Sequence, residues 1–323
     1  MSDDKQPLVS VIMSVYNEKE KWLMQAIESI VNQSYKNLEF IIILDNPDNK
    51  KLKDIIKFYN KKDARVSYFV NEKNIGLVNS LNKALSYVKG DFIARMDADD
   101  ISMLDRIERQ MDYMDKHPDV DFMGARCINI DEEGVELYRD SEIPEDMKLI
   151  KSCLVNVDFS SHPTWLFKKK CADKNQGYRE ITCAEDYDFL LRLITNGFKL
   201  GNTNEFLVRY RVRSGGISQS NSLQQHLYSK HVVRMYKDRL KYGFEKQSVE
   251  HLKNIKIDIN EENRYSSALD GLAKSKLYKK KNEFYRIYLI ATSYIKSKHL
   301  RVLLNDIVIH KCKKTLYFKN YIK

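Results

Sequence analysis

The sequence predicts an α/β fold with a mainly parallel sheet, followed by a basic and mainly helical C-terminal region. The first observation is that short apolar segments alternate with amphipathic segments along the first hundred residues. The second is an uneven charge, because residues 217–323 hold 23 Lys and Arg against 9 Asp and Glu, whereas residues 1–216 hold 32 against 36. This change of charge, together with the break at Gly215-Gly216, predicts two domains, 1–216 and 217–323.

Four strands are predicted from runs of apolar and β-branched residues, at 8–15, 39–44, 65–70 and 91–96. A helical pattern follows each of the first three, with apolar residues recurring every three to four positions around Ile27, Ile56 and Leu81. Regular alternation of this kind predicts parallel strands with helices on both faces of the sheet.

Polar residues follow three of the predicted strands, as Tyr16-Asn17-Glu18, Asp45-Asn46 and Asp97-Ala98-Asp99-Asp100. Ligands of parallel α/β sheets bind beyond the carboxyl ends of the strands. We therefore expect these three groups, which are distant in sequence, to converge in space and form a binding site.

Composition excludes several other classes of site. Glycine is scarce, and no GxGxxG or GxxxxGK[ST] spacing occurs, so a glycine-rich phosphate loop is not expected. The five cysteines are scattered without a CxxC pair, which argues against a disulfide framework and against a thiolate zinc site. The N-terminus lacks the basic start of a secretory signal, and apolar runs such as Phe40–Leu44 are too short to span a bilayer. We expect a cytoplasmic protein without a membrane span.

The acidic run at residues 97–100 has two interpretations from chemistry alone. Asp97 and Asp99 can direct their oxygens the same way from a strand end, and such oxygens suit Mg²⁺ or Mn²⁺. Alternatively, Asp99 or Asp100 caps the following helix, which carries Ile107. An EF-hand is excluded, because serine stands at the sixth position of the loop, where glycine is required.

A second acidic cluster, Glu185 and Asp186, opens a predicted helix that ends at Gly197. Acidic residues in the first turn stabilise a helix through its dipole, so a structural role is one interpretation. The other is a general base held at a helix N-terminus. Composition alone favours the structural role.

Seven motifs in order make the first ~215 residues resemble the family 2 inverting glycosyltransferases with the GT-A fold, especially those that build bacterial capsular, O-antigen and exopolysaccharide repeats. The motifs are VSVIMSVYNE (9–18), AIESIVNQSY (26–35), NIGLVNSLN (74–82), DADD (97–100), SHPT (161–164), EDYD (185–188) and YRVRS (210–214). The resemblance implies a metal-dependent hexosyltransferase that uses a nucleotide-sugar, expected to be a UDP-sugar.

The resemblance also implies the roles of donor-site residues. Tyr16, Glu18 and Asp45 would line the base and ribose pocket. Lys73, Asn74 and Gly76 would form a turn beside the nucleotide, although an ordinary turn before a helix is the alternative. Asp97 and Asp99 match the family's DxD motif, so that Asp99 would bind Mn²⁺ or Mg²⁺ and Asp97 would face the ribose and the donor sugar.

The family's catalytic base maps onto Asp186, with Glu185 as the second candidate. A carboxylate there would take the proton of the acceptor hydroxyl during attack. One base opposite the leaving group implies a single displacement, so an α-linked nucleotide sugar would yield a β-glycoside.

The chain departs from the family at one position. Many relatives carry a histidine shortly after the Tyr-Arg of the last motif, where it can complete the metal shell, and Arg213 stands there instead. Arginine cannot bind a metal but can pair with a diphosphate, so Arg211 or Arg213 would stabilise the leaving group. The alternative is a surface strand.

Two residues are expected near the acceptor. His162 precedes a proline and is either structural or close to the acceptor, and Trp165, like Phe167 and Tyr178, either stacks on a sugar ring or belongs to the core.

The basic tail has three interpretations: a solvated helical face, a nucleic-acid surface and an anionic membrane surface. Within residues 271–323 there are 14 basic and 2 acidic residues, interleaved with aromatic residues such as Tyr285 and Tyr288. We favour peripheral attachment to the inner face of the plasma membrane, with a saccharide or lipid-linked saccharide as acceptor and without nucleic acid as a partner. The non-enzymatic alternative is a basic membrane- or nucleic-acid-binding protein with a degenerate transferase domain.

Overall fold

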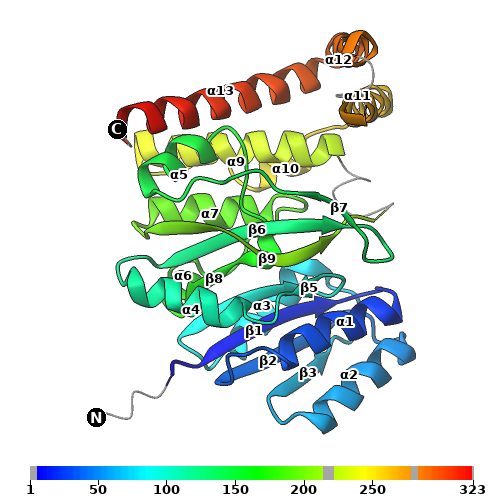
Figure 1. Cartoon of the computed structure of the whole chain (residues 1–323), viewed down its shortest axis with the longest axis vertical. Coiled ribbons are helices and arrows are strands. Elements are labelled where there is room, and N and C mark those ends of the chain that lie inside the picture. The colour runs from blue at the N-terminus through cyan, green and yellow to red at the C-terminus, as the bar shows by residue number, and fades with distance from the viewer. Residues whose placement is uncertain (1–5, 214–221, 278–282, 322–323) are drawn as a thin grey trace. The chain divides into compact units, whose positions relative to one another are not determined.

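The structure of the chain is a computed structural model that describes residues 6–213, 222–277 and 283–321 (Figure 1). The chain divides into two compact units. We call the first, residues 1–151, 158–180 and 192–213, the sheet unit, and the second, residues 152–157, 181–191 and 214–323, the helical unit. The domain boundary predicted at residue 216 lies outside the described residues, and two short segments of the first predicted domain, 152–157 and 181–191, belong to the helical unit.

The sheet unit is built on a nine-stranded sheet in the order β3-β2-β1-β4-β8-β6-β9-β5, with β7 paired to β6. The strands are β1 (Val9–Val15), β2 (Leu38–Leu44), β3 (Val66–Val70), β4 (Phe92–Asp97), β5 (Ile101–Ser102), β6 (Phe122–Ile130), β7 (Glu136–Arg139), β8 (Leu166–Lys168) and β9 (Leu200–Arg211). Strands β1 to β4 match the four predicted strands to within one residue at each end. Their predicted parallel order is also confirmed, because β1 pairs in parallel with β2 and β4, and β2 with β3.

A short antiparallel strand, β8, lies between β4 and β6, and the sequence did not predict it. Because β8 opposes both neighbours, β6 runs parallel to β4, and β9 in turn runs parallel to β6. The carboxyl ends of β1, β2, β4, β6 and β9 therefore share one edge of the sheet, which we call the carboxyl edge.

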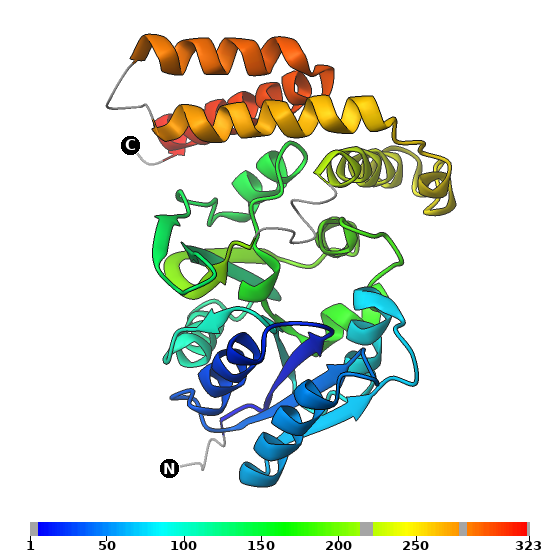
Figure 2. The same cartoon turned by 90° about the vertical axis from the view of Figure 1, so that its right-hand side faces the viewer.

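Helices cover both faces of the first four strands, as predicted. The helices are α1 (Glu20–Val31), α2 (Lys50–Lys62), α3 (Gly76–Ser86), α4 (Arg106–Lys116), α5 (Met147–Leu154), the 3₁₀-helix η1 (His162–Thr164), α6 (Lys169–Asn175) and α7 (Glu185–Thr195). Strand residues such as Val11 and Met13 join α1, α2 and α4 in one buried cluster, while α3 packs on the opposite face of β1 and β2 (Figure 2). Fully burying one such side chain contributes about 1.5–3 kcal/mol, so this cluster holds the carboxyl edge in place.

The helical unit contains α9 (Ser222–Tyr242), α10 (Glu250–Lys253), α11 (Ile259–Leu277), α12 (Glu283–Lys296) and α13 (Lys298–Tyr321), which confirms the predicted helical character of the C-terminal region. Its core is small and is centred on Leu223, Tyr265, Ala268 and Leu300. Helices α11 and α12 run antiparallel and side by side (Figure 2). No described helix is both long enough and apolar enough to cross a lipid bilayer.

Candidate active site

Three acidic side chains and one arginine meet at the carboxyl edge of the sheet unit. Asp97 ends β4, and its Oδ1 accepts a hydrogen bond of 2.6 Å from the buried guanidinium of Arg95. Two residues later, Asp99 Oδ2 lies 3.1 Å from Nε of Arg213, just beyond the end of β9. Glu18, in the loop after β1, accepts a 2.9 Å hydrogen bond from the backbone N–H of Tyr16, and it interacts electrostatically with both Asp97 and Arg213. We call Glu18, Asp97, Asp99 and Arg213 the carboxylate cluster.

Electrostatics in the carboxylate cluster disfavour negative charge. Burial raises the pKa of Asp99 to about 6, and the neighbouring Asp97 adds to the shift, while Arg213 opposes it. Burial likewise raises the pKa of Glu18, with a hydrogen bond from Tyr16 and the charge of Arg213 acting against it. Like charges held together out of water are stabilised by any cation that reaches them. The carboxylate cluster is therefore suited to a positively charged partner.

A divalent metal fits this donor set only with help from a ligand. Among the described residues, no group of three or more His, Cys, Asp or Glu side chains could hold a metal ion. Mg²⁺ and Mn²⁺ are usually held by one or two carboxylates, with waters and substrate phosphates as the other ligands. Asp97 and Asp99 match that pattern. The capping alternative is wrong, because α4 begins after Asp105 and no side chain caps it.

The Arg211 side chain makes its contacts within the protein. Its side chain is almost completely buried, and its guanidinium lies 5.2 Å from the Trp22 ring. Its four hydrogen bonds go to the backbone oxygens of Asp99, Asp131 and Glu132 and to the side chain of Gln25. These contacts correct the expectation that Arg211 stabilises a leaving group, since the guanidinium is committed to holding the loops of the site. Arg213, two residues later, is the arginine that faces the acidic side chains.

Asp100 lies beneath the carboxylate cluster, and the sequence suggested no role for it beyond that of a helix cap. It is 1% exposed, and its Oδ1 accepts a 2.7 Å hydrogen bond from the backbone N–H of Arg211. This bond ties the loop after β4 to the end of β9. The sequence also did not predict a role for Arg95. A charged residue inside an apolar strand, two positions before Asp97, is the pattern that would have indicated one.

Asp45 and the predicted turn come together at the end of β2. Asp45 is 2% exposed and accepts hydrogen bonds from the backbone N–H groups of Ile75 (2.9 Å) and Gly76 (2.8 Å), and from Asn71 Nδ2 (2.7 Å). Gly76 has φ +83°, a conformation that favours glycine. A carboxylate can accept about four hydrogen bonds, so Asp45 retains a position for one more donor. Lys73 and Asn74 are exposed beside this turn.

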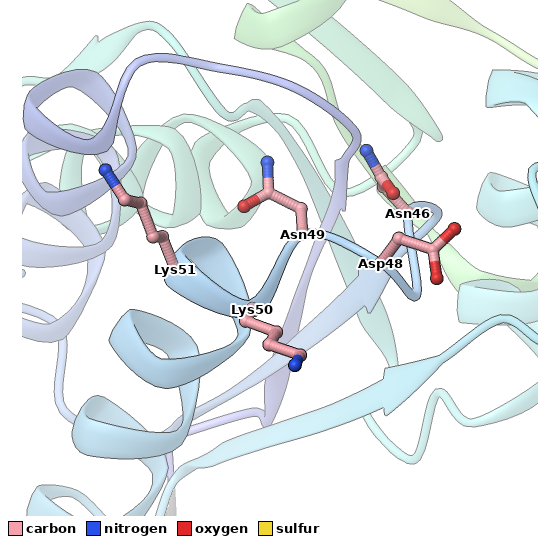
Figure 3. A pocket seen from close by; sticks show the side chains of 5 residues that line it. All are labelled: Asn46, Asp48, Asn49, Lys50 and Lys51. Carbon is pink, nitrogen blue, oxygen red and sulfur yellow. The ribbon is translucent and has the colours of Figure 1, made fainter.

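An open pocket of about 440 Å³ lies where β2 leads into α2, lined by Asn46, Asp48, Asn49, Lys50 and Lys51 (Figure 3). Asn49 caps α2 by accepting from the backbone N–H of Leu52 at 3.2 Å, and its Nδ2 donates to Asn17 Oδ1 at 3.2 Å. The pocket therefore adjoins the loop that carries Tyr16, which is 47% exposed. Asn46 was expected at this edge, whereas the two lysines were not.

The two predicted acceptor residues are buried. Trp165 has no exposed surface, contacts Phe122 edge-on, and donates from Nε1 to Ser160 Oγ at 2.9 Å. Of the two alternatives for Trp165, Phe167 and Tyr178, the structure supports the core, and stacking of Trp165 on a sugar ring is wrong in this structure. His162 Nε2 lies 2.9 Å from the Tyr178 hydroxyl, and burial lowers the pKa of His162 well below its ordinary value. His162 is thus a neutral, buried histidine of η1, so of the two alternatives the structure supports the structural one rather than a place beside the acceptor.

Glu185 and Asp186 open α7, as predicted, in the segment 181–191 of the helical unit. Glu185 is 7% exposed, and Asp186 Oδ1 accepts a 2.7 Å hydrogen bond from the backbone N–H of Tyr187. The Tyr187 hydroxyl donates to the backbone oxygen of Leu154, within the same unit. The structure thus brings Glu18, Asp97, Asp99 and Arg213 into one cluster and joins Asp45 to the turn at Gly76. The base role of Asp186 stays a prediction.

Comparisons with known proteins identify the family of this chain. The family model for glycosyl transferase family 2 matches residues 10–175. The chain is 39% identical to the uncharacterized glycosyltransferase MJ1057 of Methanocaldococcus jannaschii, over 71% of this chain and 79% of that protein. It is 30% identical to the UDP-Gal:alpha-D-GlcNAc-diphosphoundecaprenol beta-1,3-galactosyltransferase of Escherichia coli, over 71% of this chain and 86% of that protein.

The fold is also that of a solved enzyme. The mannosyltransferase PcManGT from Pyrobaculum calidifontis, solved with GDP-Man and Mn²⁺, superposes with a TM-score of 0.58 at 14% identity, over 95% of this chain and 88% of that one. The architecture is therefore the GT-A fold of nucleotide-sugar-dependent glycosyltransferases. The chain belongs to glycosyltransferase family 2.

Proposed function

We propose that this chain is an inverting, metal-dependent hexosyltransferase that moves a sugar from a UDP-sugar to a lipid-linked saccharide during cell-surface polysaccharide synthesis. The observation that carries the proposal is the carboxylate cluster, in which Asp97 and Asp99 face a site that favours positive charge. The name of the Escherichia coli relative specifies a UDP-Gal donor and an acceptor on diphosphoundecaprenol, which supports both choices.

The nucleotide would bind along the carboxyl edge. Asp45 would accept a hydrogen bond from the base with its remaining acceptor position, and Tyr16 would cover the base with its exposed ring. Glu18 would contact the ribose, and the turn formed by Lys73, Asn74 and Gly76 would close the pocket. Because Asp45 anchors that turn through two backbone N–H groups, one side chain would set both the base contact and the pocket wall.

Asp99 would hold Mn²⁺ or Mg²⁺, and Asp97 would face the ribose and the donor sugar. When bound, the metal would neutralise charge on the departing diphosphate. Arg213 would also neutralise charge on the departing diphosphate. Its guanidinium lies against Asp99 and does not make the hydrogen bonds to backbone oxygens that hold Arg211. Asp186 would remove the proton of the acceptor hydroxyl, with Glu185 as the second candidate, and attack opposite the leaving group would invert the anomeric centre.

The acceptor and the location form a further part of the proposal. A lipid-linked acceptor requires the enzyme to work at a membrane surface, and the excess of lysine and arginine in the last third supports attachment to the anionic inner leaflet. We therefore propose a cytoplasmic enzyme bound peripherally to the plasma membrane, with no nucleic acid as a partner.

A panel of nucleotide sugars tests the donor and the metal together. The protein should hydrolyse one UDP-sugar slowly, lose that activity in EDTA, and bind UDP more tightly with Mn²⁺ by calorimetry. Asp99→Asn should weaken Mn²⁺-dependent UDP binding by about 10²-fold. The matched control is Asp105→Asn, which removes an exposed carboxylate 3.5 Å from Arg109 and should change nothing.

Two outcomes would count against the proposal in different ways. Undiminished activity in EDTA would contradict the metal assignment while leaving the transferase intact. Failure to hydrolyse any nucleotide sugar would favour the alternative of a basic binding protein with a degenerate transferase domain.

A further inference from the structure

Helix α12 turns its apolar side outward. Phe284 is 89% exposed, Ile295 74%, Tyr288 59% and Ile287 56%. These residues, with the exposed Ala291, recur at three- and four-residue spacing, so at 3.6 residues per turn they fall within an arc of about 100° on one side of the helix. We call this set of five residues the α12 face.

The opposite side of α12 approaches α11 closely. Ser293 is 2% exposed and lies against Gly271 of α11, so closely that a Cβ at position 271 would overlap its Oγ. Phe284, Ile287, Tyr288 and Ile295 remain exposed on the other side and take no part in this contact. Exposure of side chains as apolar as Phe284 and Ile295 to water is unfavourable, and their burial against an apolar partner would lower the free energy.

Helices α12 and α13 are strongly basic in sequence. Between residues 283 and 321 there are eight Lys and Arg and two Asp and Glu. Both acidic residues are already paired, Glu283 with Arg286 and Asp306 with Lys230. Lys296, Lys298 and Lys311 are exposed, and of these Lys298 pairs with Glu261 of α11 at 2.5 Å. An exposed apolar face on a helix of a basic segment, with a tyrosine among its members, is the pattern of helices that lie in the interface of an anionic bilayer.

We propose that the α12 face inserts into the surface of an anionic lipid bilayer and carries the membrane attachment of this enzyme. This inference rests on the membrane location in the proposed function and names the surface responsible for it. Charge decides the occupant, because a second copy of this chain would bring the same positive charge against itself, whereas anionic headgroups complement it. The apolar side chains supply depth of insertion, and the lysines supply attraction to the headgroups.

A tryptophan placed on the α12 face reports insertion directly. The chain has two tryptophans, Trp22 and Trp165, which are 4% and 0% exposed in the sheet unit. Phe284→Trp in the full chain should shift its emission to shorter wavelength with vesicles of phosphatidylglycerol and phosphatidylcholine, and brominated lipids should quench it. The matched control is Phe58→Trp on α2, where the phenylalanine is 58% exposed, and it should show neither effect.

Removing the apolar groups tests whether they carry the binding. Phe284→Ser with Ile295→Ser should lower the fraction that sediments with these vesicles at least ten-fold, since each side chain contributes through buried apolar area. The control pair, Phe58→Ser with Leu240→Ser, removes an exposed phenylalanine and an exposed aliphatic residue elsewhere and should sediment like the parent. Circular dichroism at 222 nm confirms that both pairs keep their helices.

Three results would overturn the inference. The first is equal sedimentation of both variant pairs, and the second is no emission shift of Phe284→Trp. The third is a parent protein that is dimeric by light scattering and does not bind vesicles, together with a monomeric Phe284→Ser, Ile295→Ser variant. Donor hydrolysis separates this failure from failure of the proposed function. Hydrolysis without vesicle binding rejects the α12 face alone, and vesicle binding without hydrolysis of any donor rejects the transferase.

Discussion

In the sheet unit, β1 and β2 bury almost every side chain, and the carboxylate cluster lies where β1, β4 and β9 end. In the helical unit, α12 exposes Phe284 and Ile295, and its buried Ser293 lies against Gly271. The two units therefore handle unfavourable groups differently. The sheet unit holds a carboxylate with a raised pKa against an arginine, in a loop fixed by a deep core. The helical unit leaves apolar surface in water above a small core.

The difference between the units is clearest in the buried charged residues beneath the carboxyl edge. Arg95 and Arg106 are buried under the carboxyl edge, where Arg106 donates to the backbone oxygen of Arg95 at 2.8 Å. Such buried charges are tolerated only where hydrogen bonds and packing surround them. A ligand site that brings several charges together therefore requires a large core around it. A surface that inserts into lipid requires only that its helix stays folded and correctly placed.

Substitution of Asp186 should have the largest effect and tests whether the helical unit contributes to catalysis. Asp186 and Glu185 are the proposed catalytic groups that lie outside the sheet unit. Asp186→Asn keeps the size of the side chain and removes the proton acceptor, so kcat should fall by about 10² or more with little change in donor affinity. Steady-state kinetics with the identified donor measure both. A large loss in Glu185→Gln with none in Asp186→Asn would reverse the two roles.

Arg213 sharpens the comparison within the sheet unit. Arg213→Ala removes the guanidinium that lies 3.1 Å from Asp99 and should lower kcat/KM for the donor by about 10–50-fold. Arg213→His restores the residue that many family members carry and should retain more activity, with a lower Mn²⁺ concentration at half-maximal rate. Arg209→Ala is the control, because Arg209 donates to the backbone oxygen of Gly134 and has no contact with the carboxylate cluster. Equal losses in Arg213→Ala and Arg209→Ala would assign Arg213 a structural role.

The first four strands could be predicted from sequence because their signal is local. A run of apolar, β-branched residues identifies a buried strand, and the alternation with helices makes the strands parallel. Strand β8 could not be predicted in this way, because its three residues carry too short a pattern. It forms through pairing with β4 and β6, which are distant in sequence. The same holds for β5, with two residues paired to β9.

The candidate site shows the same limit. The rule that parallel strands present their carboxyl ends at one edge was enough to bring Glu18 and Asp97 together. It could not distinguish Arg211 from Arg213, because which of two nearby arginines is buried depends on loops far away in sequence. Nor could it place Trp165, since an aromatic residue in a core and one in a sugar site look alike without their neighbours.

Gly271 tests the helical unit alone. Gly271→Ala would drive a Cβ into Ser293 Oγ at a cost of about 1–3 kcal/mol. Alanine gains about 1 kcal/mol of helix propensity over glycine, so the net loss in the helical unit should be at most about 2 kcal/mol. Adding Ser293→Ala removes the overlap, because the nearest remaining side-chain atom, Ser293 Cβ, lies at 3.5 Å, so the double variant should recover the loss. Urea unfolding followed at 222 nm should show the change, while tryptophan emission, which reports the sheet unit, should not. A matching shift in both signals would mean that the two units unfold together.

The smallest expected effect is a gain in stability when the carboxylate cluster loses a charge. Because burial raises the pKa of Asp99 from its ordinary value of 3.8 to about 6, the folded state holds this proton more tightly than the unfolded chain does. The stabilising contribution of Asp99 is therefore complete below pH 4 and is lost as the pH rises through about 6. The amide introduced by Asp99→Asn carries no charge at any pH, so this variant should match the parent at pH 4 and exceed its unfolding free energy by on the order of 1 kcal/mol at pH 7.5. Tryptophan-detected unfolding across this range measures the difference, with Asp105→Asn as the control for loss of a carboxylate outside the cluster. A variant less stable than the parent at pH 7.5 would mean that the ion pair with Arg213 outweighs the cost of burying the carboxylate.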